Sequence, residues 1–186
     1  YNDTAAADLS RYPLAHQAVS ALVPDREGGP VCDGYSKAFQ LICDLLDIPC
    51  VCISGTGISG GKAGRHMWNA VQMEDGKWYG VDVTWDDTDS KGGRGATDTF
   101  LLVGTETVVE GRVTFRDGHV PVGNFSKGGY EFDYPTLSKT AYEANTRDTS
   151  GTKLEASALA GVQKALTQSG CTMVSAPAEV SLLKRD

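Results

Sequence analysis

No stretch of this sequence approaches the ~20 consecutive apolar residues that cross a bilayer, so we expect no membrane span. Basic character is also missing, because 17 Lys and Arg are scattered among 24 Asp and Glu and the net charge is −7. Proteins that bind nucleic acid present a basic stripe or patch. The composition therefore argues against a nucleic-acid partner.

Metal-binding patterns are absent as well. The chain has five cysteines and no Cys-x-x-Cys pair, so a zinc site has little support. Five is an odd number, which leaves at least one thiol free or paired between chains. We expect Cys43, Cys50 and Cys52 to be small buried hydrophobic residues. Nothing in the sequence requires a metal or an organic cofactor, and we expect none.

Length and composition indicate one globular domain with an appendage. The chain has 186 residues, of which 40% are hydrophobic and 22% charged. A chain of this size buries enough surface to form a stable hydrophobic core without disulfide bonds or bound metals. A polar stretch over 145–152 precedes an amphipathic pattern over 154–168. We therefore expect a domain over residues 1–145, followed over residues 146–186 by a linker, an amphipathic helix and a C-terminal segment of unknown role.

The strongest periodic pattern predicts a buried helix over residues 31–46. Apolar residues from Tyr35 to Leu46 recur at helical spacing, and Asp47 and Pro49 end the pattern. Residues 1–22 predict a helical or mixed segment. Strand patterns follow over 50–54, 66–73 and 77–85, with short strands or turns over 100–103 and 108–113.

Several features resemble binding motifs but have simpler explanations. Residues 55–60 match G-x-G-x-x-G, yet a strand pattern follows where a dinucleotide site needs a helix. We expect residues 55–64 to form a mobile glycine-rich loop beside a site. The acidic residues over 82–89 do not have the spacing of a calcium loop, so we expect a solvated acidic loop. His16 and His119 belong to no recognisable motif, and we expect ordinary roles for both.

Three residues could carry chemistry together. Cys32 begins the predicted long helix, where the partial positive charge of a helix N-terminus favours a thiolate. A nucleophilic thiolate needs a His to hold its proton and a carboxylate to orient that His. His66 and Asp82 lie on the two arms of one predicted hairpin, so they are candidates for these roles.

The register of that hairpin decides whether His66 and Asp82 can meet. A three-residue loop over 74–76, with Gly76 in the left-handed conformation, pairs Trp68 with Asp82. His66 and Asp82 then share a face as diagonal neighbours. The opposite face is almost wholly apolar: Met67, Val71, Met73, Tyr79, Val81, Val83 and Trp85. A two-residue loop would separate His66 from Asp82 unless a β-bulge intervened, so the apolar pattern favours the longer loop.

The same residues stand in local contexts that resemble the bacterial transglutaminase-like superfamily. The likeness covers about residues 29–87. It is carried by Gly29-Pro-Val-Cys-Asp-Gly-Tyr-Ser-Lys-Ala-Phe39, Asp47-Ile-Pro-Cys50, Gly55, His66-Met-Trp-Asn-Ala-Val71, Gly76-Lys-Trp-Tyr79 and Val81-Asp-Val-Thr-Trp-Asp86. A weaker likeness continues to about residue 142. Pro30 departs slightly from the family pattern, and we expect the family's upstream helix to be cut or shortened at Tyr1.

The resemblance implies an α+β fold with a papain-like core, in which an N-terminal nucleophile helix packs on an antiparallel sheet. It implies that Cys32 is the nucleophile, that His66 is the general base and then the acid, and that Asp82 orients His66. The implied enzyme acts on protein or peptide amides through a thioester intermediate.

Three activities stay open at this point. We favour a thiol hydrolase, which could be a peptidase, an isopeptidase or a deamidase. An amine-accepting protein-glutamine transglutaminase would differ in excluding water. A non-catalytic surface binding module is disfavoured, because all three site residues are present. Trp68, Trp78 and Trp85 fit cleft walls and core packing equally well.

The acidic charge and the start at Tyr1 favour an extracellular or cell-surface location, although buried free thiols suit the cytoplasm equally.

Overall fold

The computed structural model describes residues 1–8, 10–23, 29–87, 97–111, 113–123, 125–127 and 130–143. The predicted linker, the helix over 154–168 and the domain boundary near residue 145 lie outside these residues. Within them, no helix is long and apolar enough to cross a membrane.

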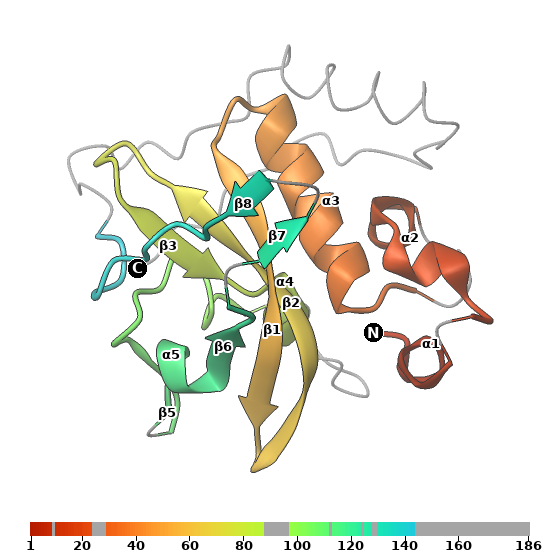
Figure 1. The fold of residues 1–186 in the computed structure, drawn as a ribbon. Coiled ribbons are helices and arrows are strands. Elements are labelled where there is room, and N and C mark those ends of the chain that lie inside the picture. Colours follow the sequence, from red (N-terminus) through yellow and green to blue (C-terminus); the bar gives the residue numbers. More distant parts are fainter. Residues whose placement is uncertain are drawn as a thin grey trace.

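A four-stranded antiparallel sheet forms the middle of the molecule (Figure 1). Its strands lie in the order β3-β2-β1-β6. Their bounds are Cys50–Ser59 for β1, Lys62–Gln72 for β2, Trp78–Val81 for β3 and His119–Pro121 for β6. Every neighbouring pair is antiparallel. The helix that begins at Cys32 packs on this sheet, which is the predicted α+β architecture.

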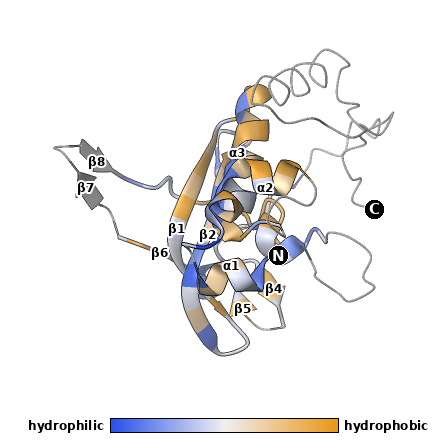
Figure 2. Ribbon diagram, turned by 90° about the vertical axis from the view of Figure 1, so that its right-hand side faces the viewer, coloured by the Kyte–Doolittle hydropathy of each residue, from blue (hydrophilic) through white to orange (hydrophobic). Residues whose placement is uncertain are grey.

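Helix α3, Cys32–Leu45, lies along strands β1 and β2, and hydrophobic residues occur on both sides of this contact (Figure 2). Its bounds agree with the predicted helix over 31–46. Cys43 packs there with Cys50, Val71 and Val81 in one buried cluster. Cys43 and Cys50 are therefore buried as predicted, whereas Cys52 is only partly buried. The four cysteines among the described residues are all free thiols.

The N-terminal segment packs against the beginning of α3 (Figure 1). It contains α1, Asp3–Ala7, the 3-10 helix η1, Pro13–His16, and α2, Ala18–Leu22. The backbone N–H of Val31 donates to the Ala15 carbonyl at 3.0 Å. A Cβ on Gly34 would lie 2.4 Å from that same Ala15 carbonyl oxygen, so only glycine permits this approach.

Short elements complete the described fold. They are α4, Val83–Asp86; β4, Val108–Glu110; β5, Val113–Thr114; α5, Phe115–Gly118; β7, Phe125–Lys127; and β8, Tyr130–Phe132. The sequence indicated strands or turns over 100–103 and 108–113. Residues 108–110 and 113–114 form the small β4–β5 pair, and Val103 makes a single bridge to Gly80.

A second apolar cluster fills the other side of the sheet. Its buried members are Ile53, Trp68, Ala70, Phe100, Val103 and Phe115. Alternation along a strand sends neighbouring residues to opposite faces, so Ala70 joins this cluster while Val71 joins the one under α3. Both faces of strand β2 are therefore buried or partly buried over residues 66–72, and polar side chains there must find partners inside the protein.

The hairpin register is confirmed. Strands β2 and β3 pair Asn69 with Val81 and Val71 with Tyr79, which is the register of the three-residue loop. The Met73 N–H donates to the Lys77 carbonyl at 3.0 Å, closing that loop. Gly76 has φ 76°, the left-handed conformation that the loop requires.

The expected glycine-rich loop over 55–64 is wrong. Strand β1 continues to Ser59 and β2 begins at Lys62, so the turn consists of Gly60 and Gly61 with φ 56° and 74°. Gly55 lies in the strand, where a Cβ would meet the Val120 carbonyl oxygen at 2.2 Å. The glycine there allows strand β6 to approach β1 closely, which composition alone does not distinguish from loop chemistry.

The predicted strand over 77–85 is also wrong at its C-terminal end. Strand β3 stops at Val81, and Asp82 becomes the N-cap of helix α4. Its carboxylate accepts hydrogen bonds from the N–H groups of Thr84 and Trp85 at 3.0 and 3.1 Å. An aspartate cap of this kind competes with continued strand pairing. Trp85 therefore leaves the apolar face on which alternation had placed it.

Candidate active site

Cys32 is the first residue of α3 and lines a cleft. The first N–H groups of a 14-residue helix have no partner within the helix, and they give this end a partial positive charge. The side chain of Cys32 is partly exposed. A thiol at such a position is accessible to a substrate or a reagent.

His66 comes from strand β2 and lies beside Cys32. Its Nε2 is 2.6 Å from Asp82 Oδ2. A further hydrogen-bonding contact joins the ring to the Cys32 thiol. Because Asp82 occupies Nε2, Nδ1 is the ring atom left to exchange a proton with the thiol.

The pKa of His66 reflects these contacts. Burial acts to lower it, but the hydrogen bond to Asp82 and the contact with Cys32 outweigh burial and raise the pKa to about 9. The imidazole is therefore protonated at neutral pH. A protonated imidazole beside a thiol is the arrangement that supports a thiolate–imidazolium pair.

Asp82 is fully buried at the junction of β3 and α4. Burial alone would raise its pKa, but hydrogen bonds from His119 and His66 hold the pKa below its ordinary value. One carboxylate oxygen faces the two imidazoles, and the other accepts from the backbone of α4. The carboxylate is thus ionised and fixed in orientation.

His119 belongs to this cluster, so the expectation of an ordinary role is wrong. Its Nε2 lies 2.9 Å from Asp82 Oδ2, and its Nδ1 lies 3.1 Å from the Phe115 carbonyl oxygen. It reaches the site because β6 pairs with β1, which places His119 opposite Gly57. The only sequence signal was indirect, since the glycines of β1 permit that pairing.

Trp85 stacks on the His66 ring, with the ring centroids 4.8 Å apart and the planes at 16°. Trp68 is buried in the core, and Trp78 packs against the same cluster. None of the three tryptophans lines the cleft that contains Cys32. Trp85 packs against this cluster as well. Core packing is therefore the correct interpretation of all three, and Trp85 in addition supports the imidazole from its face.

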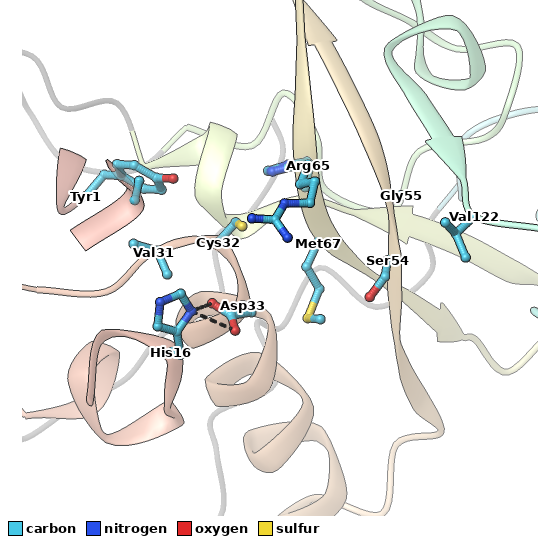
Figure 3. Close-up of a pocket in the computed structure, with 12 residues that line it drawn as sticks. Tyr1, His16, Val31, Cys32, Asp33, Ser54, Gly55, Arg65, Met67 and Val122 are labelled. Atoms are coloured by element: carbon cyan, nitrogen blue, oxygen red, sulfur yellow. Dashed lines mark hydrogen bonds and ion pairs between the residues drawn. The ribbon is translucent and has the colours of Figure 1, made fainter. Parts of the chain in front are cut away.

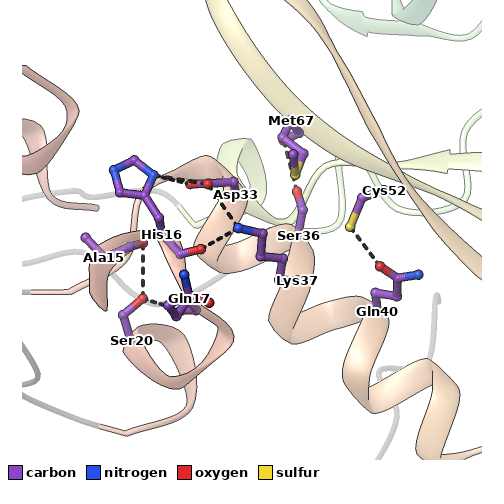
Figure 4. A network of polar contacts seen from close by, with 10 residues as sticks. All are labelled: Ala15, His16, Gln17, Ser20, Asp33, Ser36, Lys37, Gln40, Cys52 and Met67. Carbon is purple, nitrogen blue, oxygen red and sulfur yellow. Dashed lines mark hydrogen bonds and ion pairs between the residues drawn. The ribbon is translucent and has the colours of Figure 1, made fainter. Parts of the chain in front are cut away.

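A second Asp–His pair includes Asp33, the residue that follows Cys32, and Figure 4 shows its contacts. His16 Nδ1 is 2.8 Å from Asp33 Oδ1, and Lys37 Nζ is 3.3 Å from Asp33 Oδ2. Lys37 also donates to the His16 carbonyl at 2.6 Å. These contacts attach the N-terminal segment to the first turn of α3, a role for His16 that its sequence context did not indicate.

The cleft has a volume of about 380 Å³ (Figure 3). Cys32 and His66 line it, together with Asp33, Ser54, Arg65 and Met67. It lies between the start of α3 and the β1–β2 part of the sheet, so an extended substrate could reach the thiol.

The acidic residues of the expected solvated loop have separate structural roles where they are described. Asp86 is buried and accepts from the Phe100 N–H at 3.0 Å. Asp87 accepts a hydrogen bond from the Tyr35 hydroxyl. Asp89 lies outside the described residues. The solvated acidic loop is thus wrong for Asp82 and Asp86, because both are buried with backbone partners.

His66, Asp82 and His119 are the one group among the described residues whose side chains could jointly hold a metal ion. Their ligand atoms lie within 4.8 Å of one another, and nitrogen and carboxylate donors suit zinc. Both Nε2 atoms are already hydrogen-bonded to the same carboxylate oxygen. A metal would have to replace both bonds, so the geometry fits a hydrogen-bonded chain better.

Comparison with known proteins agrees with this arrangement. Residues 2–83 match the family model of the transglutaminase-like superfamily. The kyphoscoliosis peptidases of Homo sapiens and Mus musculus are each 37% identical to the chain, over 77 and 76 residues respectively. These alignments cover 37% of this chain and 10% of each relative. The likeness therefore concerns one segment of much longer proteins.

Proposed function

Because residues 2–83 match the family model of the transglutaminase-like superfamily, we propose that this protein is a cysteine-dependent enzyme that hydrolyses amide bonds of protein or peptide substrates. One observation carries the proposal. Cys32 begins α3 and contacts His66, which Asp82 holds at 2.6 Å. A nucleophile, its proton carrier and an orienting carboxylate are the minimum set for covalent acyl transfer.

The first half-reaction forms a thioester. The Cys32 thiolate attacks the carbonyl carbon of the amide, and the carbonyl oxygen becomes an oxyanion. The His66 imidazolium then donates its proton to the amide nitrogen as the C–N bond breaks. An amine or ammonia leaves, and the acyl group stays on the sulfur.

The second half-reaction releases the acyl group. Neutral His66 accepts a proton from water while the water oxygen attacks the thioester carbon. The C–S bond breaks, which yields a carboxylic acid and restores the thiolate and the imidazolium. Asp82 keeps the ring oriented through both steps and stabilises its positive charge.

The oxyanion needs hydrogen-bond donors that are already in place. The backbone N–H of Cys32 is our candidate, because it stands at the start of α3, where amides have no intrahelical acceptor. The positive end of the helix also favours developing negative charge at this position.

Two activities share this mechanism and differ only in what attacks the thioester. In the transglutaminase reaction an amine replaces water. We place hydrolysis first because the two relatives carry peptidase in their names. The family to which the segment belongs keeps amine transfer as the second candidate.

The experiment is to incubate the protein with a peptide library that contains glutamine side chains and isopeptide bonds, with and without a labelled primary amine. Mass spectrometry then follows three products: the acyl-enzyme on Cys32, the hydrolysed peptide and the amine adduct. We expect hydrolysed peptide and a trapped thioester. Predominant amine adduct would favour the transglutaminase instead.

Cys32→Ala is the decisive variant and Cys52→Ala is its matched control. Cys52 is a free, partly buried thiol whose Sγ lies 3.1 Å from Gln40 Oε1, outside the cleft lining. Cys32→Ala should abolish all three products, and Cys52→Ala should keep them. Full activity in Cys32→Ala would reject Cys32 as the nucleophile. No product and no acyl-enzyme with any substrate would favour a binding module.

A further inference from the structure

His119 makes two hydrogen bonds that fix its proton count. A carbonyl oxygen can only accept, so His119 Nδ1 must carry a proton to bond the Phe115 carbonyl at 3.1 Å. Nε2 faces Asp82 Oδ2 at 2.9 Å. An ionised carboxylate also only accepts. Both ring nitrogens of His119 therefore donate, and the ring is an imidazolium.

Asp82 has the environment of an ionised carboxylate. Donors surround it: the imidazoles of His66 and His119 on one oxygen, and two backbone N–H groups on the other. The two backbone donors have a fixed direction, and they favour the ionised carboxylate over the protonated one. This agrees with the lowered pKa of the Asp82 carboxyl.

The surroundings of His119 suit a buried cation. Its ring stacks on Phe115 with centroids 4.0 Å apart, and Trp85 lies at 4.4 Å. The faces of aromatic rings attract cations. The ring is 2% exposed, and both nitrogens have partners, which is the condition for tolerating a buried charge.

The charged groups near His119 are few among the described residues. Asp82 faces it from the β3–α4 junction, and His66 from β2 at a centroid distance of 5.9 Å. From α5, Arg116 lines a cavity that His119 also lines. Asp86 of α4 interacts electrostatically with Asp82. Asp82 is therefore the direct counter-ion of His119.

We infer that His119 is a buried imidazolium paired with Asp82, and that the centre is a four-member chain, Cys32–His66–Asp82–His119. His119 is a positioning residue in this chain. It shares the Asp82 oxygen that binds His66, and it reduces the negative charge that His66 experiences. The effect on turnover rests on the proposed function, whereas the protonation state of His119 does not.

The first test is nitrogen NMR of the histidine side chains in the unmodified protein. Both ring nitrogens of His119 should carry protons at neutral pH, and a His119→Gln spectrum assigns the signals. A His119 ring with one unprotonated nitrogen overturns the imidazolium. This measurement needs neither a substrate nor an active enzyme.

The second test is the pH dependence of Cys32 alkylation by iodoacetamide in His119→Gln. Glutamine can still donate one hydrogen bond to Asp82 but carries no charge. Removing a like charge near His66 should raise the pKa of His66, so the upper limb of the profile should move by about one pH unit to higher pH. His16→Gln is the matched control, because His16 contacts Asp33 instead.

The outcomes separate the alternatives. If the upper limb of the alkylation profile stays in place while the alkylation rate falls at every pH, His119 has a structural role only. That result would overturn its positioning role. A moved limb without turnover of any peptide would keep the four-member chain and reject the proposed hydrolase. Thermal unfolding of His119→Gln shows whether the variant is folded, and the NMR measurement decides the protonation if it is not.

A separate observation concerns the charge of the cleft. The Asp33 carboxylate is compensated by His16 and Lys37. Arg65 also lines the cleft, and it has no ion-pair partner within 4.0 Å among the described residues. Figure 3 shows its guanidinium directed toward the side of the cleft that holds Cys32. An uncompensated guanidinium beside a nucleophile favours anionic groups on the substrate.

The geometry points to a carboxylate-binding subsite at Arg65, so that preferred substrates carry a carboxylate close to the scissile amide. As a substrate preference this rests on the proposed function. Its direct test does not, because it compares alkylation of Cys32 by iodoacetate with alkylation by neutral iodoacetamide. The ratio of the two rates should fall about threefold in Arg65→Gln, the scale of one partly exposed charge pair.

Lys62→Gln is the matched control, since Lys62 is an exposed cation on the same strand and does not line the cleft. It should leave the ratio unchanged. An equal fall in both variants, or no fall in Arg65→Gln, overturns the subsite. Peptides with an acidic side chain and peptides with a terminal carboxylate near the amide then identify which source of carboxylate the site prefers.

Discussion

Two Asp–His pairs flank Cys32, and they differ in burial more than in distance. His66 and Asp82 meet at 2.6 Å with side chains 7% and 0% exposed. His16 and Asp33 meet at 2.8 Å with both side chains 21% exposed. Asp82 also binds a second imidazole and two backbone amides, whereas Asp33 binds Lys37 at the helix surface. Burial and the number of donors, rather than residue type, separate the proposed catalytic pair from the pair that attaches the N-terminal segment.

The largest effect should come from Asp82→Asn. An amide cannot offer both imidazoles a charged acceptor, so His66 loses its fixed orientation and its counter-ion. We expect kcat/KM to fall by about 10³–10⁴-fold, as for loss of the orienting carboxylate in other enzymes of this type. Asp33→Asn should lower kcat/KM by less than about tenfold. Similar losses in the two variants would remove the distinction between the pairs.

Gly57→Ala should displace the His66 side chain of the buried His66–Asp82 pair and leave the His16–Asp33 pair unchanged. A Cβ at Gly57 would lie 2.9 Å from His66 Cβ and 3.0 Å from Trp85. Overpacking of this kind costs about 1–3 kcal/mol of stability and displaces the imidazole, so we expect about a tenfold to hundredfold loss of rate. Gly64→Ala is the control, since Gly64 pairs with Gly57 and nothing lies within 4 Å of its Cβ position. Chemical denaturation and turnover measured on both variants decide the point.

The pH dependence of stability should come from the buried pair. His66 has a folded pKa of about 9, above its ordinary value near 6.5. Its contribution is therefore complete below about pH 6.5 and is lost as pH rises through about 9. Asp82 has a lowered folded pKa, so its contribution is present above about pH 4 and is lost as pH falls. Urea unfolding across pH should show a plateau between these limits.

The variant His66→Gln tests this pH profile of stability, because it removes the ionisable partner of Asp82. The upper edge of the plateau should become weaker in His66→Gln, because this variant removes the His66 contribution to it. A profile of unchanged shape in this variant would assign the pH dependence to other residues.

The smallest effect should come from His16→Gln. The variant removes the partly exposed contact between His16 and Asp33, which attaches the N-terminal segment to α3. We therefore expect the free energy of unfolding to fall by about 1 kcal/mol or less and the rate of turnover to change little. Thermal unfolding and turnover on one preparation measure both. A large drop in rate would mean that the Asp33 pair also supports the nucleophile.

Local patterns in the sequence were enough for α3, for the β2–β3 hairpin and for the proximity of His66 and Asp82, whereas the place of Cys32 beside them was implied by the family resemblance. The periodicity of α3 and the turn chemistry of residues 74–76 are short-range properties, and the register follows from them. The same kind of reasoning failed at Gly55 and Gly57, because glycine marks both flexible loops and close strand packing. It failed again at Trp85, where an aspartate cap ended the strand.

His119 shows where local reasoning stops. It is 37 residues from Asp82 in the chain, and only the pairing of β6 with β1 brings the two within 2.9 Å. Pairing between distant strands depends on packing across the whole sheet, and no short pattern around His119 encodes it. The candidate nucleophile, base and orienting carboxylate were named from the family resemblance, and the hairpin pattern placed His66 and Asp82 on one face. The second imidazole, the burial of Asp82 and the charge of the cleft arise only when distant segments exclude water from one another.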